Sequence, residues 1–242
     1  MAFPETGILD DFNRPDEGPP PSVNWTGFGA PYYMGLRVVS NQCAGSVGTT
    51  TLISGAAYWS AAFFGPDCEA YATLSDVAVS SFDFRLIVRG FNFGISPNSW
   101  QGYAMRYYEN GGSYYLELKR DETQTIERIT LPGALLVGDA IGIRALGTAI
   151  TGYLKYAAGS WTQVLSGINA VHGGAGNVAA MMIHYNVDSM AFDDFGGGGL
   201  ALVSPAPAVA VASTSLGSAI ATEKLIMLTL PSRRFMLRLP KQ

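Results

Sequence analysis

The chain has 242 residues, 48% of them hydrophobic and only 14% charged, so it can bury a substantial core and lacks the composition of a disordered protein. Its formal net charge is −4, but residues 1–200 hold 10 basic and 18 acidic residues, whereas residues 201–242 hold 5 and 1. The acidic body lacks the broad cationic surface that phosphate backbones require, so nucleic acid is not an expected partner. The basic tail is expected to meet acidic protein surface.

No membrane or export segment is expected at either end of the sequence. Residues 1–7 have no basic stretch and no apolar stretch of the kind found in secretory signals, so no signal peptide is expected. The longest apolar stretch, Leu200–Ala221, is interrupted by two prolines, so no membrane span is expected. Cys43 and Cys68 lack metal-ligand spacing and are expected to be reduced and buried, with a disulfide between them as the alternative.

Tyr, Phe, Thr, Val and Gly are plentiful and helical periodicity is nearly absent, so strands are expected to form the core. The predicted strands, in chain order, are Val77–Val88, Tyr103–Tyr108, Ser113–Lys119, Thr125–Leu131, Ala140–Leu146, Ala149–Tyr156 and Val178–Tyr185. Asn110-Gly111-Gly112 predicts a hairpin because these residues tolerate positive φ, and Gly147 predicts a second one. The pattern favours an all-β fold, a two-sheet antiparallel β-sandwich.

The two ends of the body carry similar segments, Ile8–Phe12 and Met190–Phe195, which are expected to pair in one sheet. This pairing would bring together the carboxylates of Asp10, Asp11, Asp193 and Asp194. Calcium accepts clustered carboxylates, so a structural calcium ion is one interpretation. Side chains alternate along a strand, so only one Asp of each pair can face the same way, and a polar strand edge is the other interpretation.

The body, residues 1–196, is expected to end at the four glycines that follow Phe195. A Gly/Ala/Pro/Ser-rich linker, 197–215, and an extended basic arm, 216–242, come next. The arm repeats the pattern Leu-x-Leu-Pro and is too short to bury a core of its own, so it is expected to add strands to a neighbouring sheet or to cover an edge of its own body. The predicted assembly residues are Leu228, Leu230, Arg233, Arg234, Phe235, Leu237, Arg238 and Leu239.

Several motifs occur in a characteristic order: Asp10–Arg14 followed by Trp25, then Phe82–Phe84, Gly102–Arg106, Gly138–Ile143, Gly147–Tyr153, Trp161–Val164 and Phe192–Phe195. In this order they resemble the concanavalin A-like (laminin G-like) jelly rolls of lectins, glucanases and many extracellular or bacteriophage virion proteins, over about residues 7–196. The Leu-x-Leu-Pro tail looks like the endings of tailed-phage structural proteins.

These resemblances imply a bacteriophage virion structural protein, a capsid decoration or tail component assembled in the host cytoplasm. Its partners would be other virion proteins and copies of itself, held through the C-terminal arm. The expected means of attachment is the apolar side chains of the arm filling pockets while its arginines pair with carboxylates.

No catalytic pattern is present, so the chain is not expected to be an enzyme. A glucanase of this fold would carry Glu-x-Asp-x-x-Glu on one strand, and the nearest candidate, Glu117–Glu122, has the wrong spacing. The sequence has no Gly-x-Ser-x-Gly elbow, and its two histidines, His172 and His184, are isolated.

The alternative function is a carbohydrate-binding module for host or glycan adhesion. Sugar rings stack on aromatic side chains, and Tyr33, Trp100 and Trp161 lie in or beside turn-rich segments. Trp100 follows the predicted turn 96–99, so a loop tip and a core position are equally expected for it. Trp25 and Trp59 are expected to fill the core.

Overall fold

The structure is a computed structural model that describes residues 2–29, 35–45, 54–77, 82–93, 100–184 and 190–201, and the backbone of 226–230 and 233–237. The chain divides into two compact units, Met1–Leu202 and Val203–Gln242. All regular structure in the described ranges is β, and no helix there is long and apolar enough to cross a bilayer.

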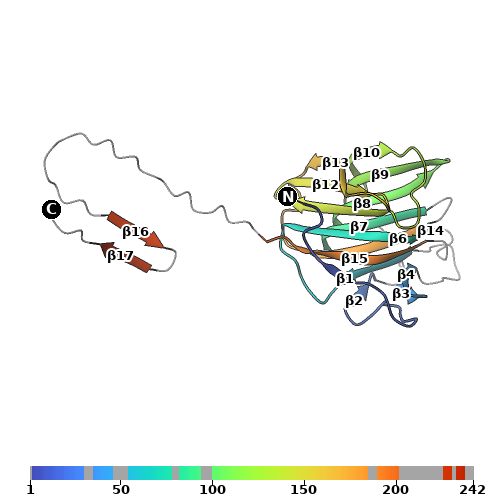
Figure 1. The fold of residues 1–242 in the computed structure, drawn as a ribbon, viewed down its shortest axis with the longest axis horizontal. Coiled ribbons are helices and arrows are strands. Elements are labelled where there is room, and N and C mark those ends of the chain that lie inside the picture. Colours follow the sequence, from blue (N-terminus) through green and yellow to red (C-terminus); the bar gives the residue numbers. More distant parts are fainter. Residues whose placement is uncertain are drawn as a thin grey trace. The chain divides into compact units, whose positions relative to one another are not determined.

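The first unit is a sandwich of two antiparallel sheets (Figure 1). The seven-stranded sheet runs in the order β10 (Gln124–Thr130), β9 (Ser113–Arg120), β8 (Gln101–Asn110), β7 (Phe82–Phe91), β14 (Asn177–His184), β5 (Ser54–Trp59) and β2 (Trp25–Gly27). The eight-stranded sheet runs in the order β13 (Thr162–Ile168), β12 (Ala149–Lys155), β11 (Ala140–Leu146), β6 (Cys68–Asp76), β15 (Ala191–Gly199), β4 (Gln42–Gly45) and β3 (Leu36–Val39), with β1 (Ile8–Asp10) paired to β15.

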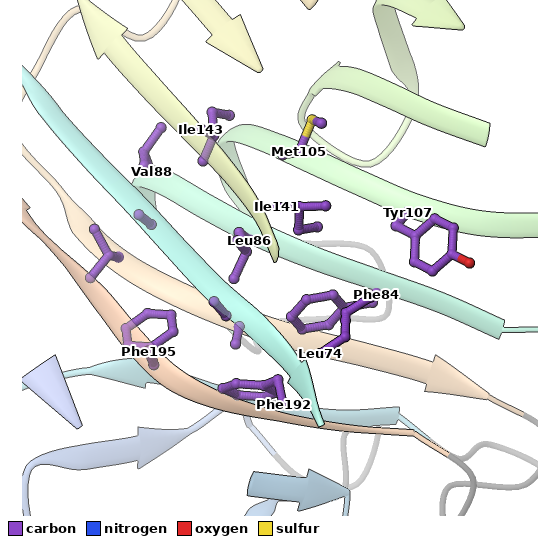
Figure 2. Packing of buried hydrophobic residues seen from close by; sticks show 14 of the residues in the cluster. Leu74, Phe84, Leu86, Val88, Met105, Tyr107, Ile141, Ile143, Phe192 and Phe195 are labelled. Atoms are coloured by element: carbon purple, nitrogen blue, oxygen red, sulfur yellow. The ribbon is translucent and has the colours of Figure 1, made fainter. Parts of the chain in front are cut away.

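The core lies between the sheets because side chains alternate along each strand. In β7, Phe82, Phe84, Leu86 and Val88 belong to the core, whereas the residues between them lie on the opposite face. Residues of the eight-stranded sheet complete the cluster (Figure 2), among them Leu74, Ile141, Ile143, Phe192 and Phe195. Trp25 and Trp59 are buried in the same core, which confirms their predicted positions.

Both predicted hairpins are confirmed. Asn110 pairs with Ser113 around Gly111 and Gly112, whose φ angles are 60° and 82°. The second hairpin joins β11 to β12 around Gly147, whose φ is 55°. Positive φ at these turn positions is the conformation that glycine adopts without steric cost.

The single strand predicted over Val77–Val88 is confirmed from Phe82 onward, as part of β7 (Phe82–Phe91), whereas Val77 lies outside any strand. The strand β6 ends at Asp76 and β7 begins at Phe82, while residues 78–81 lie outside the described part of the chain. Because β6 and β7 belong to different sheets, the chain crosses from one layer to the other within this apolar run. The hydrophobic pattern alone does not mark such a crossing.

The end segments pair as predicted, with Ile8 opposite Gly196 and Asp10 opposite Phe195. The strand β15 runs on to Gly199, three residues beyond the expected end of the body. Gly196 lies beneath the ring of Tyr71, where a Cβ atom would come within 2.0 Å of the Tyr71 Cζ atom. The glycines therefore serve close packing within a sheet, and the expected linker begins later than residue 197.

The second unit contains β16 (Ile226–Leu230) and β17 (Arg233–Leu237), which pair with each other in a two-stranded antiparallel sheet. Six of the predicted assembly residues lie in this hairpin, namely Leu228, Leu230, Arg233, Arg234, Phe235 and Leu237. Arg238 and Leu239 fall outside the described residues. Only two residues separate the strands, and this spacing favours pairing of neighbouring strands in a hairpin.

Both cysteines are buried free thiols, as expected for a reduced pair. Burial raises the pKa of Cys68 to about 11, so its thiol is protonated at neutral pH.

Candidate binding face

The strands β7 to β10 carry a row of charged and aromatic side chains on the face of the seven-stranded sheet that points away from the core. We call this surface the polar face. It is formed by Asp83, Arg85, Arg106, Tyr108, Tyr115, Glu117, Lys119, Thr125 and Arg128, with Trp100 and Glu122 beside them. Alternation explains the arrangement, because the neighbours of these residues along each strand, such as Phe84, Tyr107 and Leu118, fill the core.

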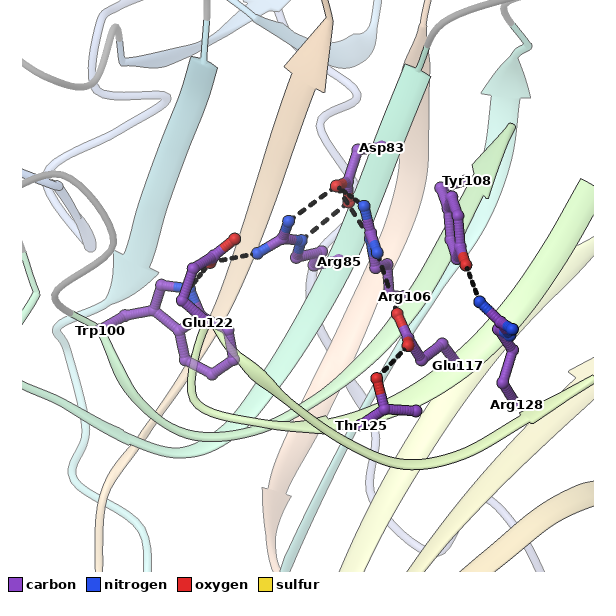
Figure 3. A network of polar contacts seen from close by, with 9 residues as sticks. All are labelled: Asp83, Arg85, Trp100, Arg106, Tyr108, Glu117, Glu122, Thr125 and Arg128. Atoms are coloured by element: carbon purple, nitrogen blue, oxygen red, sulfur yellow. Dashed lines mark hydrogen bonds and ion pairs between the residues drawn. The ribbon is translucent and has the colours of Figure 1, made fainter. Parts of the chain in front are cut away.

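Asp83 is the centre of the network in Figure 3. Arg85 binds it through two atoms, with Nε 2.8 Å from Oδ1 and Nη2 2.7 Å from Oδ2. Arg106 donates to the same Oδ2 from Nε at 2.9 Å. Asp83 and Arg85 are both buried, so these charge-assisted bonds form in surroundings with little water.

Two further carboxylates extend the network on either side. Arg106 Nη1 lies 2.9 Å from Glu117 Oε2, and the hydroxyl of Thr125 donates to Glu117 Oε1. On the other side, Arg85 Nη1 donates to Glu122 Oε2, which also accepts the indole N–H of Trp100 at 2.7 Å. Each carboxylate therefore has a guanidinium partner.

The electrostatics keep Asp83 ionised. Burial alone would raise the pKa of Asp83, but the charges and hydrogen bonds of Arg85 and Arg106 bring it below its ordinary value. Burial and the same two arginines lower the pKa of Lys119. A glycosidase needs a carboxyl group that stays protonated near neutral pH, and Asp83 is instead held as an anion.

The network reaches the surface through alternating aromatic and cationic side chains. Tyr108 and Tyr115 stack with ring centroids 5.1 Å apart. The Arg106 guanidinium lies 3.8 Å from the Tyr108 centroid, and Arg128 lies 5.2 Å from that of Tyr115. Arg128 is exposed and donates to the Tyr108 hydroxyl at 3.2 Å, while Tyr115 is half-buried. An incoming ligand would meet Tyr115 and Arg128.

Of the three predicted sugar-stacking residues, Trp100 and Trp161 do not form this surface. Trp100 is 1% exposed and packs in a small apolar cluster with Phe28 and Ile87, so its ring is closed to a ligand. Tyr33 lies outside the described residues. Trp161 lies at the opposite sheet, where its ring contacts Phe3 edge-on at 4.9 Å and Tyr71 at 6.1 Å.

The four aspartates predicted as calcium ligands do not fit a metal site. Both carboxylate oxygens of Asp10 accept hydrogen bonds from Arg14, and Oδ2 also accepts the indole N–H of Trp25 at 2.8 Å. Asp11 is exposed, and its Oδ1 accepts the backbone N–H of Asn13. Among the described residues, no three acidic, His or Cys side chains are grouped to hold a metal ion.

Asp193 lies in an acidic environment. Burial, and then the charges of Asp194, Asp11 and Asp10, raise its pKa, although a hydrogen bond from the Asp194 N–H opposes them. A carboxyl group whose pKa is higher in the folded chain contributes stability below its unfolded pKa, and loses this contribution as pH rises through the folded value. At pH 7 the Asp193 carboxylate is therefore unfavourable.

Asp193→Asn is accordingly expected to stabilise the protein at pH 7 by about 0.5 kcal/mol, a small gain because solvent screens a partly exposed charge. Urea unfolding at pH 7 and at pH 4 measures the effect. The gain should shrink at pH 4, where the wild-type group takes up a proton; an equal change at both values would contradict the electrostatic cause.

The sequence carried a signal for the polar face that the search for individual motifs missed. Charged or tyrosine residues recur at every second position in three neighbouring strands, at Asp83 and Arg85, Arg106 and Tyr108, and Tyr115, Glu117 and Lys119. Such an alternation of polar and apolar residues indicates strands that are packed against the core on one face only.

No family model matches the sequence, and no curated protein matches it. Solved structures share its fold. The Ca²⁺-bound exoplasmic/lumenal domain of VIP36 aligns with a TM-score of 0.57 at 10% identity, covering 81% of this chain and 90% of that one. The legume lectin-like domain from Entamoeba histolytica aligns with a TM-score of 0.53 at 8% identity, covering 74% of this chain and 91% of that one.

The lectin UEA-II, solved in complex with galactose, aligns with a TM-score of 0.52 at 12% identity, covering 72% of this chain and 92% of that one. Identities this low establish the fold alone. The chain thus has the legume-lectin-like, concanavalin-like β-sandwich fold that the motif order implied, and the virion role stays a prediction.

Proposed function

We propose that the protein binds carbohydrate on the polar face of its seven-stranded sheet. The observation that carries this proposal is the stacked pair Tyr108 and Tyr115 beside the exposed Arg128. A tyrosine ring offers an apolar surface to a sugar ring, and a guanidinium donates paired hydrogen bonds to hydroxyls or to a sugar carboxylate. Behind them, Arg106 lies over the Tyr108 ring and is itself ion-paired with Asp83 and Glu117.

Structural neighbours support the same reading. VIP36 has been solved with Man₃GlcNAc, at 12% identity and a TM-score of 0.56, and UEA-II with galactose. The polar face adds a reason within this chain, because the lowered pKa of Asp83 suits an ion-paired binding surface better than acid catalysis. A non-enzymatic role therefore remains our prediction.

A glycan array containing neutral and acidic oligosaccharides tests the proposal, followed by calorimetric titration of the best ligand. Tyr115→Ala is expected to weaken binding about tenfold through loss of stacking. Arg128→Ala is expected to weaken it by about ten- to a hundredfold through loss of a charged hydrogen bond. Tyr156→Ala, which removes an exposed tyrosine following β12, serves as the matched control and should leave affinity unchanged.

A second candidate function is assembly through the C-terminal hairpin, the means by which a virion protein would attach to other virion proteins or to copies of itself. The pairing register supports it, because Ile226, Leu228 and Leu230 share one face of the hairpin with their partners Leu237, Phe235 and Arg233. An isolated two-stranded hairpin is marginally stable in water, so such an apolar face favours contact with another surface.

Sedimentation velocity of the full chain and of the Leu228→Asp/Phe235→Asp variant tests this candidate. Self-association by the wild type at about 100 µM and a monomeric variant are the expected results, since two charges would remove the apolar face. Thr229→Asp, which alters the opposite face, should behave as the wild type does. Equal masses for all three proteins would contradict self-assembly through the hairpin.

A further inference from the structure

Residues 2–6, which we call the strap, lie across the outer face of the eight-stranded sheet without belonging to any strand. The Phe3 ring stacks parallel to Tyr153, with centroids 3.8 Å apart and planes 3° from parallel. Tyr71 and Trp161 meet it edge-on at 6.3 and 4.9 Å. Three aromatic side chains from separate segments thus form a receptor for one ring.

The receptor has space for that ring because a glycine lies beneath it. A Cβ atom on Gly142 would approach the Phe3 Cζ atom to 2.4 Å, which is closer than contacting atoms come. Any larger residue in this position would therefore exclude the phenylalanine. We call the hollow formed by Tyr71, Gly142, Tyr153 and Trp161 the Phe3 seat.

A buried ion pair recognises the rest of the strap. Glu69 is fully buried and accepts hydrogen bonds at Oε1 from the backbone N–H groups of Glu5 and Thr6 and from the Thr6 hydroxyl. Its other oxygen lies 2.6 Å from Arg144 Nη2, which also donates to the Ala2 carbonyl at 2.8 Å. Arg144 Nη1 lies 3.1 Å from the Glu5 carboxylate.

The Phe3 seat, Glu69 and Arg144 contact atoms within residues 2–6. The same contacts could form with a strap that is not covalently joined to the same body. The link runs through Gly7, which is exposed and whose carbonyl accepts one hydrogen bond from the Gly197 N–H at 3.2 Å. A strap from another molecule would present the same atoms to the same seat. Exchange of such a segment between identical chains is a low-cost route to an oligomer.

We propose that the Phe3 seat, with Glu69 and Arg144, is a peptide-binding site whose ligand is the strap of a second copy of this chain. The ligand class is an extended segment with an aromatic residue, an acidic residue two positions later and a hydroxyl residue after it. The covalent link keeps the strap of each chain at a high effective concentration near the seat of the same chain. The strap of a second copy can therefore bind only when a chain's own strap has left the seat.

Two complementary variants test the proposal. Phe3→Ala/Glu5→Ala leaves the seat intact and weakens the strap, whereas Gly142→Leu fills the seat and leaves the strap free. A fluorescent peptide, Ala-Phe-Pro-Glu-Thr-Gly, should bind the first variant saturably and should not bind the second. The same peptide with alanine in place of phenylalanine should bind at least about tenfold more weakly, and Trp161→Ala added to the first variant should have a similar effect.

Mixing the two variants tests the second-copy occupant directly. Native mass spectrometry should detect a mixed dimer that neither variant forms alone. No peptide binding by a folded Phe3→Ala/Glu5→Ala chain would overturn the site, and peptide binding without a mixed dimer would overturn the second copy as its ligand.

A third protein keeps the test valid if the first variant does not fold. A protease recognition sequence placed after Gly7 in the full chain allows cleavage after folding, so that the strap is held by the seat alone. Excess labelled peptide should then displace it. Retention of the original strap against a hundredfold excess of peptide over several days would contradict exchange.

Discussion

Replacing Arg85 with alanine is expected to lower the free energy of unfolding at pH 7 by about 3–5 kcal/mol, because the buried Asp83 loses its bidentate partner and keeps only Arg106, and Glu122 loses its guanidinium partner. Arg85 is 2% exposed and binds both Asp83 and Glu122. Urea unfolding measures the loss. Arg128→Ala is the control, since Arg128 is exposed and its removal should cost less than about 1 kcal/mol.

The pH dependence gives this prediction a second readout. The pKa of Asp83 is lowered in the folded chain, so its contribution is present above the unfolded pKa of about 3.9 and is lost as pH falls through the folded value. The difference between wild type and Arg85→Ala should therefore persist down to about pH 4 and narrow below it. Equal stability of the two proteins at pH 7 would contradict a central role for the ion pair.

Replacing Glu69 with alanine is expected to lower the free energy of unfolding by a similar amount, about 3–5 kcal/mol. The substitution leaves the buried Arg144 without the Glu69 carboxylate, and it removes the acceptor of three hydrogen bonds that the strap donates. Urea unfolding gives the energy, and limited proteolysis near Gly7 reports release of the strap. Glu5→Ala, which removes a more exposed partner of Arg144, should cost less than about 1 kcal/mol.

Two outcomes would contradict this account of the strap. The first is a Glu69→Ala protein as stable as Glu5→Ala. The second is an unstable Glu69→Ala protein whose strap is cleaved no faster than that of the wild type, because the loss would then come from the sheet alone.

The features that local sequence determines were predicted correctly, and so was one pairing between distant segments. The hairpin turn at Gly111 and Gly112 depends on residues within a few positions, and their positive φ angles match their chemistry. Pairing of Ile8–Phe12 with the Met190–Phe195 segment was also predicted, because two similar segments at the ends of one domain favour closure of a sheet.

The remaining features depend on contacts between distant residues. The glycines after Phe195 resemble a linker until the Tyr71 ring is placed over Gly196. Trp100 follows a predicted turn, yet its indole N–H donates to Glu122 and its ring is buried. The strap has no periodicity, and the residues that hold it, Glu69 and Arg144, lie far along the chain.

The candidate site also depended on contacts between strands and was not predicted from single motifs. Sugar-stacking aromatic residues were predicted in turn-rich segments, whereas the stacked pair of Tyr108, which is buried, and Tyr115, which is half-buried, lies on neighbouring strands. Their proximity follows from the register of β8 with β9, which the predicted hairpin already implied. A search for polar positions at a spacing of two on adjacent predicted strands would have found them.

The most direct test of carbohydrate binding on the polar face is a crystal structure of the full chain with the strongest ligand from the glycan array. We expect a sugar ring stacked on Tyr115, at about 4 Å from its ring, with Arg128 donating to a hydroxyl or carboxylate of the ligand. A glycan seated elsewhere on the molecule, with Tyr115 and Arg128 unliganded, would contradict the proposed site.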